Sequence, residues 1–195
     1  MSARDDVLRR VRSALAQADT SPVTVPRGYR QGTVGDVDLF VERVEDYKAV
    51  VVRCSADEVE ARIAEALPDG ARVVVPPGLP WHVEGAEEDH GLTSTELDDV
   101  AAVVTGATCG IAVTGTIVLS HGPGEGRRVA TLVPDLHVCV VRADQVVADV
   151  PDAVATLDPS RPQTWISGPS ATSDIELNRV EGVHGPRTLH VVVVG

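Results

Sequence analysis

Lysine is nearly absent from this chain of 195 residues: Lys48 is the only one, and every other basic residue is Arg. The sequence therefore contains no G-x-x-x-x-G-K-[ST] phosphate loop. A Schiff-base enzyme would have to use Lys48, which opens the apolar run KAVVV and is expected to be structural. There is also no G-x-S-x-G elbow, so a hydrolase triad is not indicated.

Cysteine is equally scarce. Cys54, Cys109 and Cys139 lie far apart, and none has the spacing of zinc or iron–sulfur ligands. Cys54 and Cys139 follow or lie within apolar runs, and we interpret them as small core residues. Cys109 lies in a Gly-rich stretch, where a structural role is still favoured. No His pair has i, i+4 helical spacing, so neither a metal nor a bound cofactor is expected in this chain.

Long hydrophobic runs are missing, and the longest are the size of single strands, far short of the ~20 residues of a membrane span. The charged N-terminus lacks the apolar core of a signal peptide, so the default location is the cytoplasm. The net charge is −12. Such a surface repels phosphate backbones, which argues against nucleic-acid binding, and the acidic stretch 36–99 is interpreted as a solvated face.

What is present is an ordinary globular composition, 43% hydrophobic and 24% charged, in a chain long enough for one domain with or without an arm. Residues 4–18 place Val7, Leu8, Val11 and Leu15 at helical spacing, with Arg on the opposite face. Residues 19–35 contain Pro and Gly without periodicity. We therefore take 1–35 as an N-terminal amphipathic helix and linker. The helix packs either on its own body or on another subunit, so a homo-oligomer through this helix stays open.

Strand-like and helix-like segments alternate after residue 36. A helix is expected over about 36–47, and a capping box at Ser55–Glu58 is expected to start another. This alternation predicts an α/β fold with a mainly parallel sheet flanked by helices. The centre of that sheet is expected from residues 48–53, 72–75, 101–104, 116–119, 137–141 and 189–194.

The segment 105–128 is the most unusual in the chain. Gly122, Gly124 and Gly126 permit close backbone approach, and Arg127 and Arg128 are suited to a bidentate clamp on a carboxylate or phosphate. The other interpretation is tight-turn architecture, which such glycine spacing also forms.

A second candidate is the segment 167–175, which is either an anion cradle or a capped turn. Four His flank or lie in strands, where a general acid or base and a structural role are both open. The candidate site residues from these segments are Gly168, Ser170, Thr172, Asp174, His121, His137, His184 and Arg187.

These motifs carry a resemblance. IAVTGTIVL, HGPGEGRR, LVPDLHVCVV, ISGPSATSDIE and GVHGPRTLHVVVV, from about Val103 to the C-terminus, resemble the lactate utilization protein C family, which shares the lactate-utilization (LUD) domain. Residues 36–195 would form this LUD-like domain. The resemblance implies a fold similar to ribose-5-phosphate isomerase, glucosamine-6-phosphate deaminase and CoA transferases. It also implies that this chain is the non-redox component of a bacterial system. That system oxidises L-lactate to pyruvate with two iron–sulfur partner proteins.

The sequence departs from the family pattern at two positions. Where the family often has A-E-T-G-T, Val113 replaces the Glu, and Ser120 stands where Asp is frequent. In related CoA transferases a Glu is the covalent nucleophile, so acyl transfer at this position is disfavoured. The resemblance implies that Thr114, Gly115 and Thr116 form part of an anion pocket, with no catalytic role carried over. An independent small-molecule enzyme of this fold and a regulatory adaptor remain the alternatives.

Overall fold

The computed structural model describes residues 2–19, 21–26, 28–29, 32, 34–172, 180–181 and 185–195, with only the backbone at 171–172 and 180–181. Its centre is a six-stranded sheet in the order β1-β12-β7-β4-β2-β3. All its neighbouring strands are parallel, as the alternating sequence pattern predicted. The strands are β1 (Val50–Cys54), β2 (Val73–Val75), β3 (Glu87–Glu88), β4 (Ala102–Thr105), β7 (Leu136–Arg142) and β12 (Thr188–Val194).

The two longest strands, β7 and β12, lie side by side and are buried on both faces. Alternate side chains therefore enter two different cores. Cys139 and Val191 pack beneath α2 (Val37–Asp46), which contributes Phe40 and Val44. The opposite face, with Val138 and Val192, is covered by α3 (Val59–Ala66). Strands buried on both faces explain the continuous apolar runs in the sequence.

The helices begin where side-chain oxygens can satisfy free backbone N–H groups. Asp36 caps α2 by accepting from the N–H groups of Asp38 and Leu39. The expected capping box at Ser55–Glu58 is wrong, because α3 begins only at Val59 and no side chain caps it. The Glu58 carboxylate instead accepts from the Ser55 backbone and hydroxyl, which closes a turn before the helix.

A second sheet packs on the α2 side of the first. It has four strands in the order β8-β5-β6-β9: β8 (Val146–Val147), β5 (Cys109–Ile111), β6 (Thr116–Leu119) and β9 (Thr164–Ile166). The expectation that 116–119 belongs to the central sheet is thus wrong. Strand β6 pairs antiparallel with β5 and β9, and its Ile117 and Leu119 pack against the main sheet. Its outer face is covered by α5 (Val150–Thr156).

Short elements complete the body. They are α4 (Ser94–Asp98), the 3-10 turns η1 (Arg128–Thr131) and η2 (Ala143–Gln145), and the antiparallel pair β10 (Ala171–Thr172) and β11 (Val180–Glu181). Cys54, Cys109 and Cys139 are all buried, as expected of small core residues. None of the described helices is both long and apolar enough to cross a bilayer.

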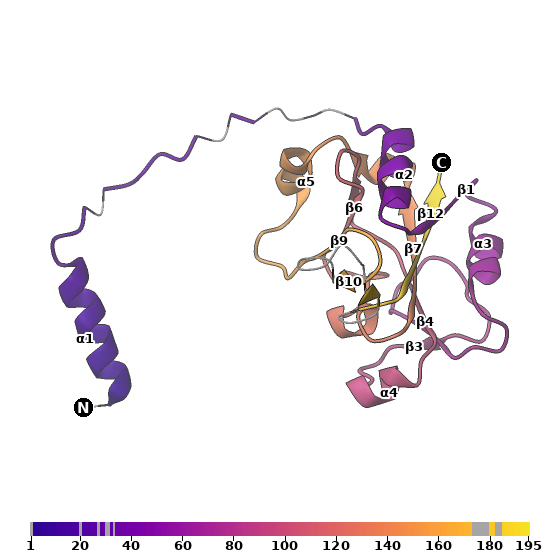
Figure 1. Ribbon diagram of the computed structural model, residues 1–195, viewed down its shortest axis with the longest axis horizontal. Helices are drawn as coiled ribbons and strands as arrows, with labels where there is room; N and C mark the ends of the chain where they lie inside the picture. Colours follow the sequence, from indigo (N-terminus) through magenta and orange to yellow (C-terminus); the bar gives the residue numbers. More distant parts are fainter. Residues whose placement is uncertain are drawn as a thin grey trace.

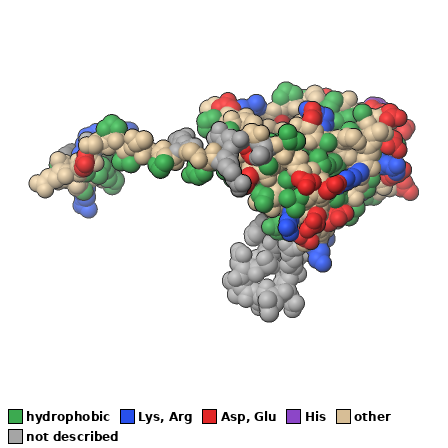
Figure 2. Space-filling model, turned by 90° about the horizontal axis from the view of Figure 1, so that it is seen from above, with side chains coloured by type: hydrophobic (Ala, Val, Ile, Leu, Met, Phe, Trp, Pro, Cys, Tyr) green, Lys and Arg blue, Asp and Glu red, His purple; other side chains and the backbone are tan. Residues whose placement is uncertain are grey.

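Helix α1 (Ala3–Leu15) lies apart from this body in Figure 1, and none of its residues is buried. The far end of the linker does contact the body. The Gly35 N–H donates to the Val146 carbonyl oxygen at 3.1 Å, and Gly32 donates to the Asp152 carboxylate at 2.7 Å. Figure 2 shows groups of Asp and Glu side chains on the body, with Lys or Arg side chains among them, and the arm extending away from the body.

Candidate functional site

A pocket of about 300 Å³ lies beside the start of β7 and β12, bounded by η1 and by the chain that runs from β9 to β10. We call it the Arg128 pocket. Leu132, Leu189 and Pro186 contribute apolar walls, while Arg128, hydroxyl groups and one imidazole contribute polarity. Among its described lining residues none is acidic, which distinguishes it from the larger hollow beside α3, where Glu60, Asp69 and Glu84 occur.

Arg128 is the first residue of η1, and its side chain is exposed to solvent. No carboxylate of the described residues forms an ion pair with its guanidinium. An Arg with no ion-pair partner among the described residues, beside a pocket without described carboxylates, attracts carboxylates and phosphates and can bind them with two parallel hydrogen bonds.

His137 is the second residue of β7 and is almost fully buried, with 1% of its surface exposed. Burial lowers the pKa of His137 to about 4, so the ring is neutral at neutral pH. Its Nε2 lies 2.8 Å from the Thr105 hydroxyl, and that hydroxyl contacts the Cys139 sulfur at 3.7 Å. The sequence placed His137 near the Gly-rich loop, and the structure places it in the pocket wall.

His121 lies just after β6 and has a positive φ of 56°, unusual for a residue with a side chain. Its Nδ1 is 2.8 Å from the Gly126 carbonyl oxygen, and its Nε2 is 2.8 Å from the Thr164 hydroxyl. Thr164 lines the pocket, so His121 contacts the site through Thr164 rather than directly.

Thr164 was not singled out by sequence, whereas Thr114 and Thr116 in the hydroxyl row beside it were candidates. Thr164 pairs with Leu119, whose side chain lies between the two sheets, so Thr164 also points inward. Thr114 donates to Thr116, and Thr116 lies 2.9 Å from the Ser167 hydroxyl at the pocket. The alternation in TWIS could have indicated an inward Thr164, but only if the pairing with β6 had been known.

The candidate glycines serve close backbone contacts. A Cβ on Gly115 would lie 2.6 Å from the Arg43 backbone, and one on Gly168 would lie 2.5 Å from the Tyr47 Cβ. Gly124 has a positive φ and lies against the Gly78 carbonyl, while Gly122 lies under the Arg161 guanidinium. The close contacts of these four glycines agree with the interpretation as tight turns. Of the four, only Gly168 also lines the Arg128 pocket.

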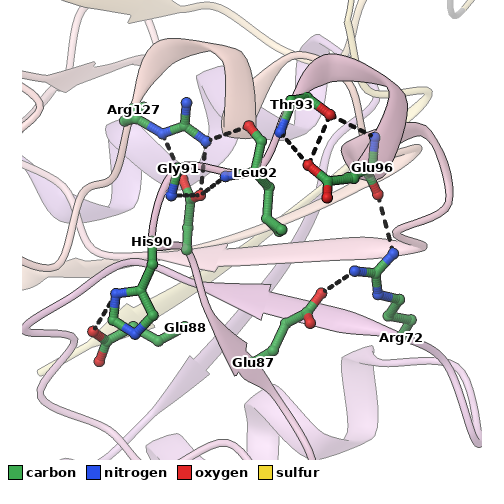
Figure 3. A network of polar contacts seen from close by, with 10 residues as sticks. Arg72, Glu87, Glu88, His90, Gly91, Leu92, Thr93, Glu96 and Arg127 are labelled. Carbon is green, nitrogen blue, oxygen red and sulfur yellow. Dashed lines mark hydrogen bonds and ion pairs between the residues drawn. The ribbon is translucent and has the colours of Figure 1, made fainter.

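Arg127 and Arg128 do not form a joint clamp. The Arg127 guanidinium binds Asp89 with Nε at 2.8 Å and Nη2 at 2.7 Å, and donates to the Leu92 carbonyl oxygen (Figure 3). Arg127 therefore ties the Gly-rich loop to the segment after β3, and only Arg128 lines the pocket.

The remaining candidates are dispersed. Ser170 lines the pocket, whereas Arg187 is exposed and lies 3.6 Å from an Asp135 carboxylate oxygen. Thr172 is described only by its backbone in β10, and Asp174 and His184 lie outside the described residues. Within the described part of the chain, no group of three or more His, Cys, Asp or Glu could hold a metal ion.

Glu125 is a carboxylate of the Gly-rich loop that sequence reasoning did not consider. It accepts from the Thr108 hydroxyl at 2.9 Å and from the Ser120 N–H, and it does not line the Arg128 pocket. Val113 lies on the surface beside Thr114 and Arg43, also outside that pocket.

The fold and the pocket together define an α/β protein with a parallel main sheet, a packed second sheet and an arginine-bearing pocket between them. The family model described as the LUD domain matches residues 37–194. The chain therefore belongs to the LUD domain family.

Individual relatives agree with this assignment. "Lactate utilization protein C" of Deinococcus radiodurans is 48% identical over 165 residues, covering 80% of this chain and 78% of that protein. The protein of the same name from Bacillus pumilus is 33% identical, over 58% of this chain and 49% of its own length. The crystal structure of a DUF162 family protein from Deinococcus radiodurans matches with a TM-score of 0.69 and 39% identity, over 82% of this chain and 96% of that one.

Proposed function

We propose that this chain takes part in lactate utilization, as the non-redox component of a bacterial system that oxidises L-lactate to pyruvate. The 48% identity to a lactate utilization protein C, over most of both chains, supports this proposal. The electrons would pass through two iron–sulfur partner proteins, since the three cysteines of this chain are buried and far apart in sequence.

We further propose that the Arg128 pocket binds a small carboxylate. The observation that carries this is the exposed Arg128 guanidinium, which has no ion-pair partner among the described residues, beside a pocket whose described walls contain no acid. A carboxylate would gain charge-assisted hydrogen bonds there without displacing an ion-pair partner that the described residues supply.

An independent acyl-transfer enzyme is less well supported. That chemistry needs a carboxylate nucleophile facing the substrate. Val113 replaces the family's frequent Glu and lies outside the pocket, and the Glu125 carboxylate is bound to Thr108 and Ser120. A component that binds its ligand and acts with partners fits these positions better.

The test is reconstitution. The chain is tagged, its partners are isolated from its host grown on L-lactate, and lactate-dependent dye reduction is measured with and without the chain. We expect reduction only when this chain and both iron–sulfur proteins are present. The Arg128→Ala variant should fail to restore it, whereas Arg161→Ala, an exposed Arg outside the pocket, should restore it. Full reduction without this chain would refute the proposal.

A further inference from the structure

Helix α1 and the hollow beside α3 are two surfaces that no described segment covers, and they are complementary in shape and charge. We propose that α1 of one copy of this chain docks into the hollow beside α3 of a second copy, which docks its own α1 in return. We call this hollow the α3 groove. It shares no lining residue with the Arg128 pocket, so the inference can fail without affecting the proposed function.

Helix α1 presents an apolar stripe to solvent. Val7, Leu8, Val11 and Leu15 recur at helical spacing, and each is between 38% and 58% exposed. A helix of 13 residues is marginal in water by itself, because its propensity hardly offsets the cost of nucleating it. The stripe therefore needs a surface to pack against, and α1 lies apart from its own body in Figure 1.

Cationic side chains border this stripe. Arg4 and Arg12 each lie four residues from Leu8, so they are its neighbours on the helix surface. Neither guanidinium forms an ion pair with a described residue, whereas the other two Arg of α1 pair with Asp6. A surface that suits α1 is thus apolar in its centre and acidic around it.

The α3 groove has an apolar wall of this kind. It is a hollow of about 520 Å³ formed by α3, by the chain that follows α3 and by the loop 82–85. The apolar side chains include Ile63, Leu67, Val73 and Val83, and no Lys or Arg is among its lining residues. The groove can therefore take apolar side chains from a helix, with nothing in its lining to repel a cation.

Exposed acids complete the match. Glu60, Asp69 and Glu84 all line the groove, and none of them forms an ion pair with a described residue. The Glu60 carboxylate does accept the backbone N–H of His82 at 2.8 Å. Exposed ion pairs contribute little affinity, but opposite charges around an apolar contact favour one partner and one orientation. The Arg side chains that border the stripe of α1 supply those charges.

The arm and the groove of one copy lie on opposite sides of the main sheet. The linker reaches the body beside the second sheet, where Gly32 contacts Asp152 of α5 and Gly35 contacts Val146 of β8. That sheet packs on the α2 side, whereas the groove belongs to the α3 side. Residues 16–31 span only about 50 Å when extended, which makes the path around the sheet edge long. A second copy avoids this path, and a two-fold axis lets both arms dock together.

The test measures the molar mass of the full chain by sedimentation equilibrium, from low-micromolar to near-millimolar concentration. Because each docked arm is a small contact, we expect monomers at the low end, where the arm adds nothing to stability, and dimers at the high end. Leu8→Asp should weaken dimerisation at least about a hundredfold, since a charge enters an apolar groove at two contacts. Ser13→Asp places the same charge on the opposite face of α1 and should dimerise like the native chain.

The groove is tested by charge reversal. Asp69→Arg combined with Glu84→Arg leaves the apolar wall intact and should weaken dimerisation at least about tenfold. Asp98→Arg combined with Asp99→Arg makes the same change of charge at the end of α4, outside the groove, and is the control. All these positions are exposed, so none of the substitutions should unfold the body.

Mixing the variants distinguishes a second copy from the chain's own body. The Leu8→Asp chain keeps a native groove, and the groove variant keeps a native arm, so their equimolar mixture should form heterodimers more readily than either variant associates alone. A mixture that associates no better than its components overturns the exchange of arms. A native chain that is monomeric at every concentration overturns it as well, and so does a native-like dimer of Leu8→Asp.

Discussion

Asp89 and Arg127, 38 residues apart in sequence, form a bidentate ion pair whose carboxylate side chain is 2% exposed. Gly91 and Leu92 donate backbone N–H groups to the same carboxylate at 3.0 Å. The Arg127 guanidinium, together with these N–H groups, holds the pKa of Asp89 below its usual value. This pair assigns the first Arg of GEGRR to structure, whereas the second, Arg128, takes no part in it.

Replacing Arg127 should therefore reduce stability rather than ligand binding. In Arg127→Ala the Asp89 carboxylate stays buried with only its backbone donors, and we expect a loss of about 1–3 kcal/mol in unfolding free energy. Urea denaturation at neutral pH measures it. Arg161→Ala, which removes an exposed Arg with no ion pair among the described residues, serves as the control and should change the midpoint little. Equal stability of the two variants would contradict the structural assignment.

Replacing Arg128 should have the opposite pattern. In Arg128→Ala the unfolding midpoint should stay near that of the native chain, because the guanidinium is exposed and forms no ion pair with a described residue. Lactate affinity should fall about tenfold or more, as charge-assisted hydrogen bonds are lost. Calorimetry and urea denaturation on the same sample separate the two effects. If Arg128→Ala lowered stability and left lactate affinity intact, Arg128 would have a structural role and not a binding role.

Acid should destabilise the chain in a window set by His137. Its folded-state pKa of about 4 lies below the unfolded value of 6.5, so the unfolded state gains a proton first as pH falls. Stability is complete above about pH 6.5 and declines towards pH 4, by up to about 3 kcal/mol. Asp89 acts separately, because its lowered pKa makes its contribution disappear only at still lower pH. Urea midpoints at pH 7, 5.5 and 4.5 test this, and His137→Gln should flatten the decline.

The turn between β5 and β6 should not tolerate a side chain. Gly115 has φ of 59°, and its added Cβ would meet the Arg43 backbone at 2.6 Å. Gly115→Ala should reduce stability by about 2–4 kcal/mol, through backbone strain and displacement of α2. Gly85→Ala is the matched control, since Gly85 has φ of 71° but nothing within 4 Å of its added Cβ. The difference between their thermal midpoints isolates the contact, and no difference would argue against it.

Removing the arm should leave the body unchanged in stability. Deletion of residues 1–19 removes α1, none of whose residues is buried. We expect the same urea midpoint and the same lactate affinity as the full chain. A large drop in the midpoint would mean that α1 packs on a body, its own or another copy's, and size-exclusion chromatography of both forms would then distinguish these arrangements.

Several features were determined by the sequence alone, because they depend on neighbours along the chain. Apolar runs of strand length alternating with the amphipathic pattern of α2 and α3 predicted the parallel sheet and its helices. The scattered positions of the three cysteines already excluded the spacing of a metal site. Pro and Gly without periodicity marked the linker that follows α1.

Other features depended on contacts between distant segments, which no local pattern encodes. The sequence TIVL of β6 is typical of a central strand. In the structure, however, β6 turns back on β5 through Gly115 and belongs to the second sheet. Arg127 and Arg128 are indistinguishable in sequence, and only the position of Asp89 separates them. Thr164 reaches the pocket wall because β9 pairs with β6 in the register that places it opposite Leu119. Pairing register is a property of the folded chain, and it decides which side chains form the wall of the pocket.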